Sequence, residues 1–262
     1  MLIAWLLPVA AGAENLSLDG PLTQGGLVIG KTVPGARVSI DGRDVRVSSK
    51  GRFLIGFGRD AGALVRLRII HPGGGLTEKT LKVAKRQYKV QRIDGLPAAK
   101  VTPPPEDLER IQDDNAKIAH VRRQDTDRTD FASGFRWPAT GPISGVFGSR
   151  RVLNGKPKNP HNGVDLAAPR GSTVVTPADG IVVLAHPDMF YTGKTVMIDH
   201  GHGLTSVYAH METIRVSRGQ RIVKGTPIGT VGKTGRTTGP HLHWGVTLFG
   251  THLDPALLVE SN

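Results

Sequence analysis

The stretch TVVTPADGIVVLAH (173–186) places Pro177-Ala178-Asp179-Gly180 between two runs rich in Val and Ile. Pro, Asp and Gly favour tight turns, and short β-branched runs bounded by such residues favour strands. The pattern therefore predicts two strands separated by a tight turn.

The same pattern continues through the rest of the C-terminal half, where short apolar runs are interrupted by glycine and no stretch after Phe135 has a convincing helical period. The other strand-like segments are PISGVFGS, KTVMIDHGHGLTSVYAHM, RIVKGTPIGTVG and HLHWGVTLFG. We therefore expect residues 135–262 to form an all-β domain, as a compact sandwich or barrel.

The N-terminal part of the chain also predicts strands. ARVSIDG (36–42) and LVRLRII (64–70) alternate apolar and polar residues, which is the period of a half-buried strand, and Asp41-Gly42 is a hairpin signal. Five to seven short strands with regular turns indicate a small β-sandwich over residues 14–100. No cluster of chemically reactive side chains is found there, so positioning or wall binding is the expected role.

Residues 101–134 have a different composition. VTPPP is stiff and extended, and residues 106–124 carry acidic groups first and basic groups last, which matches the dipole of a helix. The sequence thus predicts a Pro-rich, helical linker, and the fold class as a whole is mainly β.

Residues 1–13 predict export. An apolar core from Leu2 to Val9 precedes Ala11-Gly12-Ala13, an A-x-A cleavage pattern, and is too short to span a bilayer. We read residues 1–13 as a signal peptide. The expected location is periplasmic or secreted, without a transmembrane segment.

The chain has a formal net charge of +12 and no cysteine. The absence of cysteine excludes disulfides and thiolate metal sites. The charge favours an anionic partner, such as peripheral association with an anionic wall or membrane surface. No basic helix or aromatic RNA-binding signature is found, so we expect no nucleic-acid partner. The sequence does not define the oligomeric state.

Three short segments carry side chains that suit a metal site. They are HNGVD with His161 and Asp165, SVYAHM with Tyr208 and His210, and HLHWG with His241 and His243. Residues i and i+2 of a strand face the same side, so the last two histidines address one space. Zinc accepts imidazole nitrogens and carboxylate oxygens at about 2.0–2.1 Å.

The spacing alone leaves the ligand set open. His161, Asp165, His241 and His243 together would form a closed structural site, whereas an open catalytic site needs one imidazole of the HLH pair free. His210 ends a Val-Tyr-Ala-His run with the same parity as Tyr208. A free His210 and a free His241 would then flank a bound water, one accepting its proton and the other stabilising an oxyanion.

The three motifs, in this order, resemble those of the lysostaphin-type (LytM-like) zinc metallopeptidases that cut peptide bonds in peptidoglycan. The similarity covers roughly residues 137–256 and includes GVFGSRRVLNGKP and GKTGRTTGPHLHWGV. It implies one zinc ion per chain, held by His161, Asp165 and His243, with His210 and His241 as catalytic residues. It also implies an antiparallel β domain with a duplicated hybrid motif and a groove across the sheet.

The resemblance makes an exported zinc endopeptidase that hydrolyses peptidoglycan stem peptides or cross-links the leading hypothesis. The alternative is a non-catalytic wall-binding regulator or activator of other hydrolases. A regulatory variant is also open, in which the linker helix and the N-terminal domain occlude the groove. A phosphotransferase carrier with a related hybrid motif fits poorly. Such carriers need a phosphorylatable histidine in the cytoplasm, whereas this chain has a His-x3-Asp site behind a predicted signal peptide. The resemblance implies two candidate bonds, the D-alanyl to meso-diaminopimelate cross-link of Gram-negative walls and the glycine bridges of Gram-positive walls.

Other side chains have simpler expectations. His200 and His202 should lie in a hairpin turn, and His252 at a solvated or capping position. Tyr208 is either a core residue or a group that orients a catalytic one. The remaining suggestions are that Phe190 and Tyr191 wall a groove and that Arg150, Arg151 and Arg236 meet peptide carboxylates.

Overall fold

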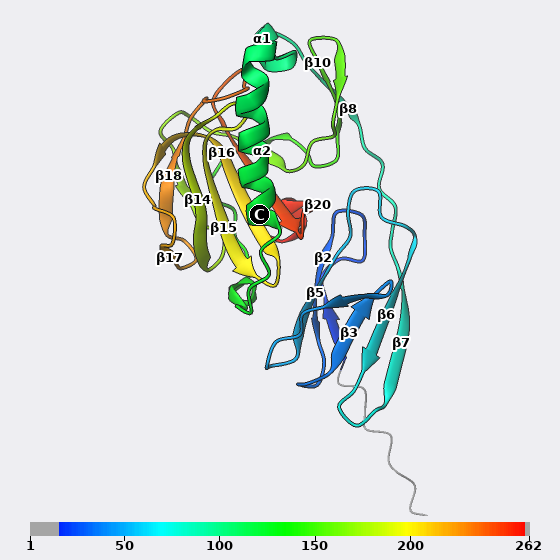
Figure 1. Ribbon diagram of the computed structural model, residues 1–262. Coiled ribbons are helices and arrows are strands. Elements are labelled where there is room, and N and C mark those ends of the chain that lie inside the picture. The colour runs from blue at the N-terminus through cyan, green and yellow to red at the C-terminus, as the bar shows by residue number, and fades with distance from the viewer. Residues whose placement is uncertain (1–15, 260–262) are drawn as a thin grey trace, which may run out of the picture.

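The computed structural model describes residues 16–259, so the signal peptide predicted over residues 1–13 lies outside the described residues. The fold is mainly β and its sheets are almost entirely antiparallel, which confirms the predicted fold class. The C-terminal sheet and helix α2 occupy one side of Figure 1, and the N-terminal strands lie below and beside them.

The N-terminal strands form two sheets, in the orders β1-β2-β5 and β4-β3-β6-β7. Their apolar faces share one core that includes Phe53, Ile55, Leu67 and Ile69. The strands are β1 (Ser17–Asp19), β2 (Leu27–Lys31), β3 (Arg37–Ile40), β4 (Arg43–Val45), β5 (Arg52–Gly56), β6 (Leu64–Ile70) and β7 (Leu76–Lys82). In β6 the residues alternate between exposed and buried, as the sequence period predicts.

Strand β8 (Val90–Ile93) follows these two sheets in the chain but belongs to neither of them. It pairs in parallel with β10 (Arg150–Leu153) of the C-terminal half. β10 forms a hairpin with β11 (Lys156–Lys158) through Asn154-Gly155, where both residues have positive φ. Asn-Gly is a strong hairpin signal in the sequence, yet we did not predict this turn. The domain boundaries 14–100, 101–134 and 135–262 remain a prediction, and β8 ties the first range to the third.

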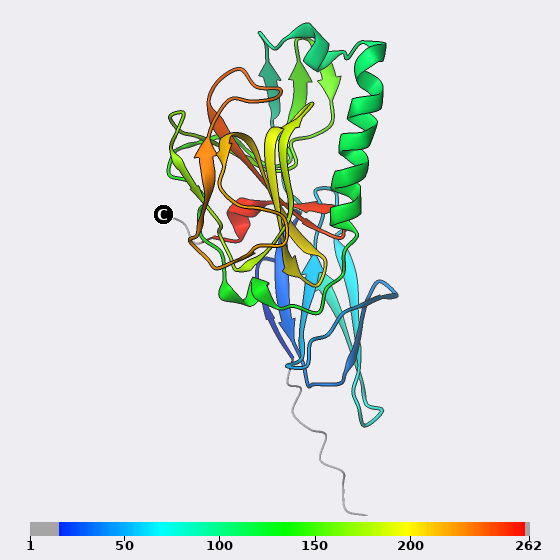
Figure 2. The ribbon, with the colours of Figure 1, turned by 60° about the vertical axis from the view of Figure 1, so that its left-hand side comes forward.

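The linker contains helices, as predicted. It comprises α1 (Ala98–Val101), the 3₁₀ turn η1 (Pro105–Asp107) and α2 (Leu108–Arg122). Ile118 and Val121 of α2 pack against Leu184, Met197 and Val207 of the large sheet. Burial of this narrow apolar stripe fixes the helix along one face of that sheet (Figures 1 and 2).

The large sheet has ten strands, seven of them in the order β17-β14-β15-β16-β19-β12-β9. The other three, β13, β18 and β20, pair off this path. Its strands are β9 (Ile143–Gly145), β12 (Val164–Ala167), β13 (Thr173–Val175), β14 (Gly180–Met189), β15 (Gly193–Gly201), β16 (Leu204–Ile214), β17 (Arg221–Ile222), β18 (Pro227–Val231), β19 (His241–Leu248) and β20 (Thr251–Leu253). After Phe135 the only helical piece among the described residues is the 3₁₀ turn η3 (Pro255–Leu257), and the 3₁₀ turn η2 (Asp130–Ser133) lies just before Phe135.

The pairing register sorts the side chains of the sheet onto two faces. Tyr208 lies opposite Trp244, and both belong to the main apolar core. Val207 and Ala209 lie opposite Gly245 and His243 on the other face. Because Met197 pairs with Val207, helix α2 covers the same face that carries the histidine.

The N-terminal sheets contact the C-terminal part directly. Leu27 of β2 and Leu54 of β5 belong to the main apolar core of the large sheet. Arg86 donates to Asp254 at 2.7 Å across the junction, and the Asp254 side chain is only 4% exposed. The two parts are therefore joined by apolar packing and by a partly buried ion pair.

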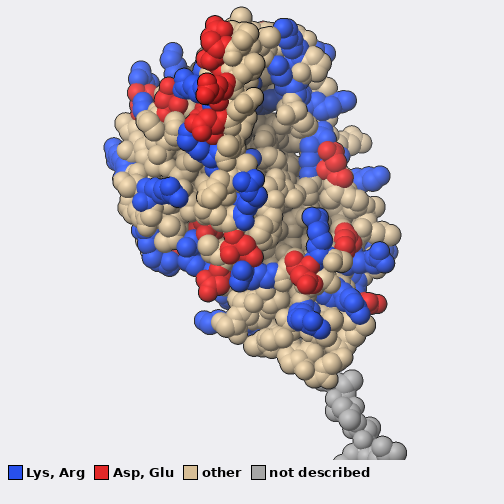
Figure 3. Space-filling view, in the orientation of Figure 1, with Lys and Arg blue, Asp and Glu red and all other residues tan. Residues whose placement is uncertain are grey.

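The described residues contain no helix that has both the length and the apolar character needed to cross a bilayer. Lys and Arg side chains are scattered over the face shown in Figure 3, among Asp and Glu. Acidic side chains gather over the first half of α2, in keeping with Glu106, Asp107 and Glu109. This face therefore has no single basic stripe.

Candidate metal centre

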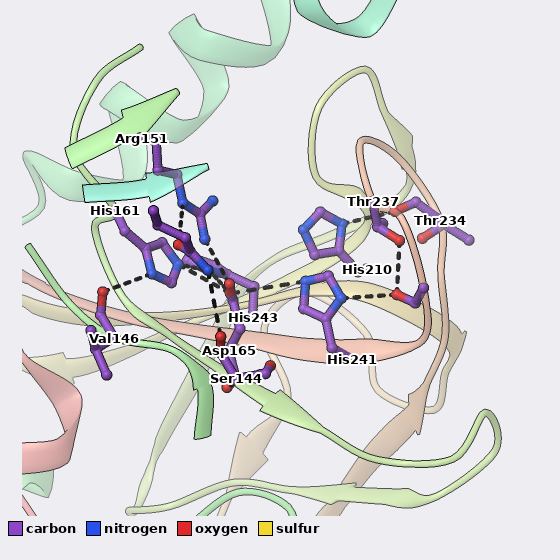
Figure 4. A network of polar contacts seen from close by, with 12 residues as sticks. Ser144, Val146, Arg151, His161, Asp165, His210, Thr234, Thr237, His241 and His243 are labelled. Carbon is purple, nitrogen blue, oxygen red and sulfur yellow. Dashed lines mark hydrogen bonds and ion pairs between the residues drawn. The ribbon is translucent and has the colours of Figure 1, made fainter. Parts of the chain in front are cut away.

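Three of the predicted site residues converge at one point on the helix-covered face of the sheet. Asp165 of β12 pairs with His243 of β19, and His161 lies in the loop that enters β12. Oδ1 of Asp165 lies 3.0 Å from Nε2 of His161 and 2.9 Å from Nδ1 of His243. The two imidazole nitrogens are 3.0 Å apart (Figure 4). Among the described residues, these three side chains form the one cluster that could hold a metal ion.

The neighbours of His161 determine which of its nitrogens is free. Nδ1 lies 3.1 Å from the carbonyl oxygen of Val146 and, as the donor of that bond, carries the proton. A neutral ring then presents the lone pair of Nε2 to a carboxylate oxygen that is itself an acceptor. Two acceptor atoms that face each other in this way, Nε2 of His161 and Oδ1 of Asp165, are suited to bind a cation between them.

The geometry fits a zinc ion. Ligands about 2.0–2.1 Å from a tetrahedral zinc lie roughly 3.3 Å from one another. The three donor atoms, all about 3.0 Å apart, need only a small expansion to reach that spacing. Two imidazoles and one carboxylate are also a donor set that zinc accepts in catalytic sites.

Asp165 is held at both oxygens. Nη2 of Arg151 donates to Oδ2 at 2.6 Å, which leaves Oδ1 to face the two histidines. The Nε of Arg151 donates in turn to the side-chain oxygen of Gln91 at 3.3 Å. The pairing of β8 with β10 therefore contributes to the orientation of the carboxylate.

Glycines leave room for these side chains. A Cβ at Gly145 would lie 2.3 Å from Oδ2 of Asp165, and a Cβ at Gly163 would lie 2.8 Å from Cε1 of His243. Both positions therefore exclude larger residues while the carboxylate and the imidazole keep their places.

The buried surroundings change the proton affinities of the cluster. Burial alone would raise the pKa of Asp165, but the adjacent imidazoles of His161 and His243 hold it well below its usual range. Burial lowers the pKa of His243 to about 4, although Asp165 opposes that shift. At neutral pH the cluster therefore offers an ionised carboxylate and a neutral His243, the protonation states that a metal ligand needs.

The remaining pair, His210 and His241, lies beside the cluster with ring centres 4.8 Å apart. Nδ1 of His210 donates to the Thr234 carbonyl oxygen at 2.8 Å, and Nδ1 of His241 donates to that of Gly239 at 2.9 Å. Both rings therefore keep Nε2 free. Nε2 of His241 is 3.9 Å from Asp165, outside the three-residue cluster, so the geometry favours the open ligand set over the closed one.

His210 reaches this place through a β-bulge. The register between β15 and β16 shifts next to His210, whose φ is 62°, a left-handed conformation that few non-glycine residues adopt. The expected common parity with Tyr208 is therefore wrong. The ring of Tyr208 stays in the core, where its hydroxyl contacts Ser206 at 2.8 Å, while His210 turns to the metal-site face.

Other histidines have different outcomes. His200 and His202 lie at the β15–β16 hairpin, as predicted, and His200 contacts the carbonyl oxygen of Asp179 and the hydroxyl of Ser206. His252 is partly buried, not fully solvated as expected. Its Nδ1 is buried without a partner among the described residues, and Nδ2 of Asn162 donates to its Nε2 at 3.2 Å.

Sequence reasoning missed the groups that support the cluster. Arg151 was expected to meet a peptide carboxylate, but it contacts Asp165 of the same chain. The carbonyl oxygens of Val146 and Thr234 carry no signal in a sequence, because any residue supplies one. Gly145 in the strand-like PISGVFGS is a signal that close packing was to be expected.

Comparison with known proteins agrees with this geometry. Residues 159–255 match the model of peptidase family M23. A crystal structure of a peptidase M23 from Pseudomonas aeruginosa superposes with a TM-score of 0.69 at 30% identity, covering 92% of this chain and 96% of that one. The fold of nearly the whole chain is therefore shared with that protein.

Curated relatives are similar over part of the chain. The peptidoglycan DD-endopeptidase ShyA of Vibrio cholerae is 45% identical over 111 residues, which is 41% of this chain and 25% of ShyA. The DD-carboxypeptidase/endopeptidase Mpg of Neisseria meningitidis is 40% identical over 95 residues, 36% of this chain and 22% of Mpg. This chain spans about a quarter of the length of these relatives. With the match to the family model and the shared fold of the Pseudomonas structure, these similarities show that the chain belongs to peptidase family M23.

Proposed function

We propose that this protein is an exported zinc endopeptidase that hydrolyses peptide bonds in peptidoglycan, with His161, Asp165 and His243 as metal ligands and His210 and His241 as catalytic residues. One observation carries the proposal. Three ligand atoms lie about 3.0 Å from one another, and two further imidazoles with free nitrogens stand beside them.

The names of the relatives support the substrate class. ShyA is named a peptidoglycan DD-endopeptidase and Mpg a DD-carboxypeptidase/endopeptidase. A substrate in the cell wall agrees with a periplasmic or secreted location and with the signal peptide predicted over residues 1–13. The division into an N-terminal β domain (14–100), a linker (101–134) and a peptidase domain (135–262) is part of the same proposal.

The residues of the chain would divide the work of hydrolysis. When bound, zinc supplies Lewis acidity that makes water nucleophilic near neutral pH and polarises a carbonyl oxygen. Asp165 would hold its ligand oxygen in place through its bond to Arg151, at 2.6 Å. The backbone carbonyls of Thr234 and Gly239 would keep Nε2 of His210 and His241 aimed at the reacting atoms.

The protonation state of His210 bears on its role. Burial, followed by the nearby His241 and His243, lowers its pKa to about 3, so the ring is neutral at physiological pH. Since Nδ1 is committed to Thr234, only Nε2 could accept the proton of the attacking water, and a pKa so far below 7 makes that nitrogen a weak base. We therefore assign the transfer of that proton to the leaving amine to one of His210 and His241, not to His210 alone. The other histidine of the pair would stabilise the developing oxyanion, which requires a proton on its Nε2 because Nδ1 already donates to a backbone carbonyl oxygen.

Digestion of purified sacculi tests the proposal. The zinc-loaded full chain should release peptide fragments, and mass spectrometry of those fragments would define the bond that is cut. His210→Ala and His243→Ala should each abolish release. A protein that binds zinc but leaves sacculi intact would favour the non-catalytic regulator instead.

The occlusion hypothesis needs a separate measurement, since α2 covers part of the face that carries the site. If α2 blocks the groove, loosening it with Val121→Asp should increase the rate of release from sacculi. An unchanged or reduced rate, with the melting temperature of the C-terminal part preserved, would argue against occlusion.

A further inference from the structure

Arg122, in the last turn of α2, is a partly buried cation without an ion-pair partner among the described residues. Its Nε is inaccessible to solvent and makes no hydrogen bond, and no side chain of residues 16–259 forms an ion pair with it. Burial lowers the pKa of Arg122 to about 10. A buried donor without a hydrogen bond is costly, so the unsatisfied Nε of this arginine calls for an explanation.

The side chain borders a cavity of about 510 Å³ between α2 and the large sheet. The polar and aromatic residues that line it include Asn115, Arg122, Arg123, Asn162, Tyr191 and Thr192. The cavity also contains one carboxylate, that of Asp114, but its Oδ2 accepts a hydrogen bond from the backbone N–H of Phe190 at 2.7 Å and forms no ion pair with Arg122. The cavity therefore combines two guanidinium groups with hydrogen-bonding side chains.

The cavity adjoins the metal-site residues along the chain. Asn162 directly follows His161, and its side-chain amide is fixed by a bond to His252 at 3.2 Å. The carbonyl oxygen of Thr192 accepts the backbone N–H of His210 at 2.8 Å. A ligand bound under α2 would therefore lie next to both a predicted zinc ligand and a predicted catalytic residue.

The favourable end of the helix dipole does not account for Arg122. A cation near a helix C-terminus gains about 0.3–1 kcal/mol when exposed, and Arg123 or His120 could supply that gain from an exposed position. That interaction also leaves the Nε donor unsatisfied. A planar guanidinium with free donors is instead matched to a carboxylate, which it can bind through two parallel bonds.

We propose that Arg122 binds a carboxylate of the peptide substrate, so that α2 forms one wall of the substrate groove and selects for a negative charge near the scissile bond. The inference rests on the proposed function and deepens it. Two sources of the carboxylate share the same chemistry, the C-terminal carboxylate of a peptide and an acidic side chain within it.

Binding of short peptides to the zinc-loaded full chain tests this site. The probes are N-acetyl-Ala-Ala with a free C-terminus, its C-terminal amide, and N-acetyl-Glu-Ala amide, which carries a side-chain carboxylate only. Calorimetry with Arg122→Gln and with Arg218→Gln as the matched control compares the loss of one positive charge at two places. Arg218 is exposed in the loop before β17 and makes no ion pair among the described residues.

The wild type and the control should bind one of the carboxylate probes at least about tenfold more tightly than the amide, and Arg122→Gln should lose that preference. The preferred probe identifies the source. Equal binding by Arg122→Gln and the wild type, as expected if the carboxylate binds only at the metal, would overturn the proposal. So would a wild type without any preference for a carboxylate.

Stability and sacculus digestion complete the test. Removal of a partly buried, unpaired charge should leave the melting temperature of Arg122→Gln equal to or above that of the wild type. If the melting temperature of Arg122→Gln falls well below that of the wild type, Arg122→Lys replaces it in the test. The site is rejected unless Arg122→Lys melts like the wild type and loses the preference for a carboxylate probe over the amide. A wild type that binds the carboxylate through Arg122 but leaves sacculi intact refutes the proposed function alone. Digestion of sacculi without any role of Arg122 in binding refutes this inference alone.

Discussion

Arg151 and Asp165 form an ion pair in which Nη2 donates to Oδ2 at 2.6 Å, and the opposite oxygen of the same carboxylate faces His161 and His243. The Arg151 side chain is 18% exposed and that of Asp165 is 10% exposed, so the pair is shielded from water. In the proposed metal site, Arg151 would therefore act through the orientation of one ligand.

Arg151→Gln should weaken zinc binding by about 10- to 100-fold, because groups that orient a ligand contribute that much to metal affinity. The affinity can be measured by competition with a chromophoric chelator. Arg150→Gln is the matched control, since its neighbouring side chain is exposed and forms no ion pair among residues 16–259. Equal losses in both variants would show that the effect is one of net charge.

Zinc should bind with a stoichiometry of one ion per chain and raise the melting temperature of the metal-free protein, because a ligand that binds only the folded state stabilises it. Asp165→Asn should lose most of this stabilisation. Native mass spectrometry and thermal melts with and without a chelator provide the measurements. Stabilisation that survives the Asp165 substitution would place the ion elsewhere.

His210→Ala and His241→Ala should keep the zinc ion but lower kcat by about 10²- to 10⁴-fold, the usual contribution of a group that transfers protons. Metal analysis of the same samples separates this result from loss of a ligand. His120→Ala, which changes an exposed histidine of α2, is the control and should behave like the wild type. Loss of zinc from His241→Ala would instead show that His241 is a ligand, as in the closed four-ligand site.

Gly145→Ala should disturb the cluster, since the new Cβ would meet Oδ2 of Asp165 at 2.3 Å. We expect weaker zinc binding and a lower melting temperature. Gly73→Ala is the control, because a Cβ there has no neighbour within 4 Å. If both substitutions are tolerated equally, the carboxylate has more freedom than the structure indicates.

The free energy of unfolding should decrease as the pH falls below about 6.5, the pKa of histidine in an unfolded chain. Burial lowers the pKa of His200 in the folded protein, so the unfolded state binds the proton first and its contribution to stability is lost as the pH falls. The slope of one such group is about 1.4 kcal/mol per pH unit. Chemical denaturation of the wild type and His200→Gln between pH 7 and pH 5 should give a shallower slope for the variant.

The sequence by itself determined the residue types at the site and the class of fold. Val and Ile runs broken by Pro and Gly specify strands because they favour extended backbone and tight turns, and the i, i+2 spacing of His241 and His243 puts both on one face of a strand. The helix of the linker was predictable from its charge order. These are local properties, which short stretches of chain encode.

Only the tertiary structure decided how these residues are used. The register of β12 with β19 brings Asp165 to His243, and a bulge in β16 turns His210 away from the side that strand alternation predicts. The partner of Arg151 and the isolation of Arg122 depend on segments that are distant in the chain. Side-chain alternation can be read from a sequence because it repeats every two residues, whereas register, bulges and buried charge pairs depend on which strands and helices pack together.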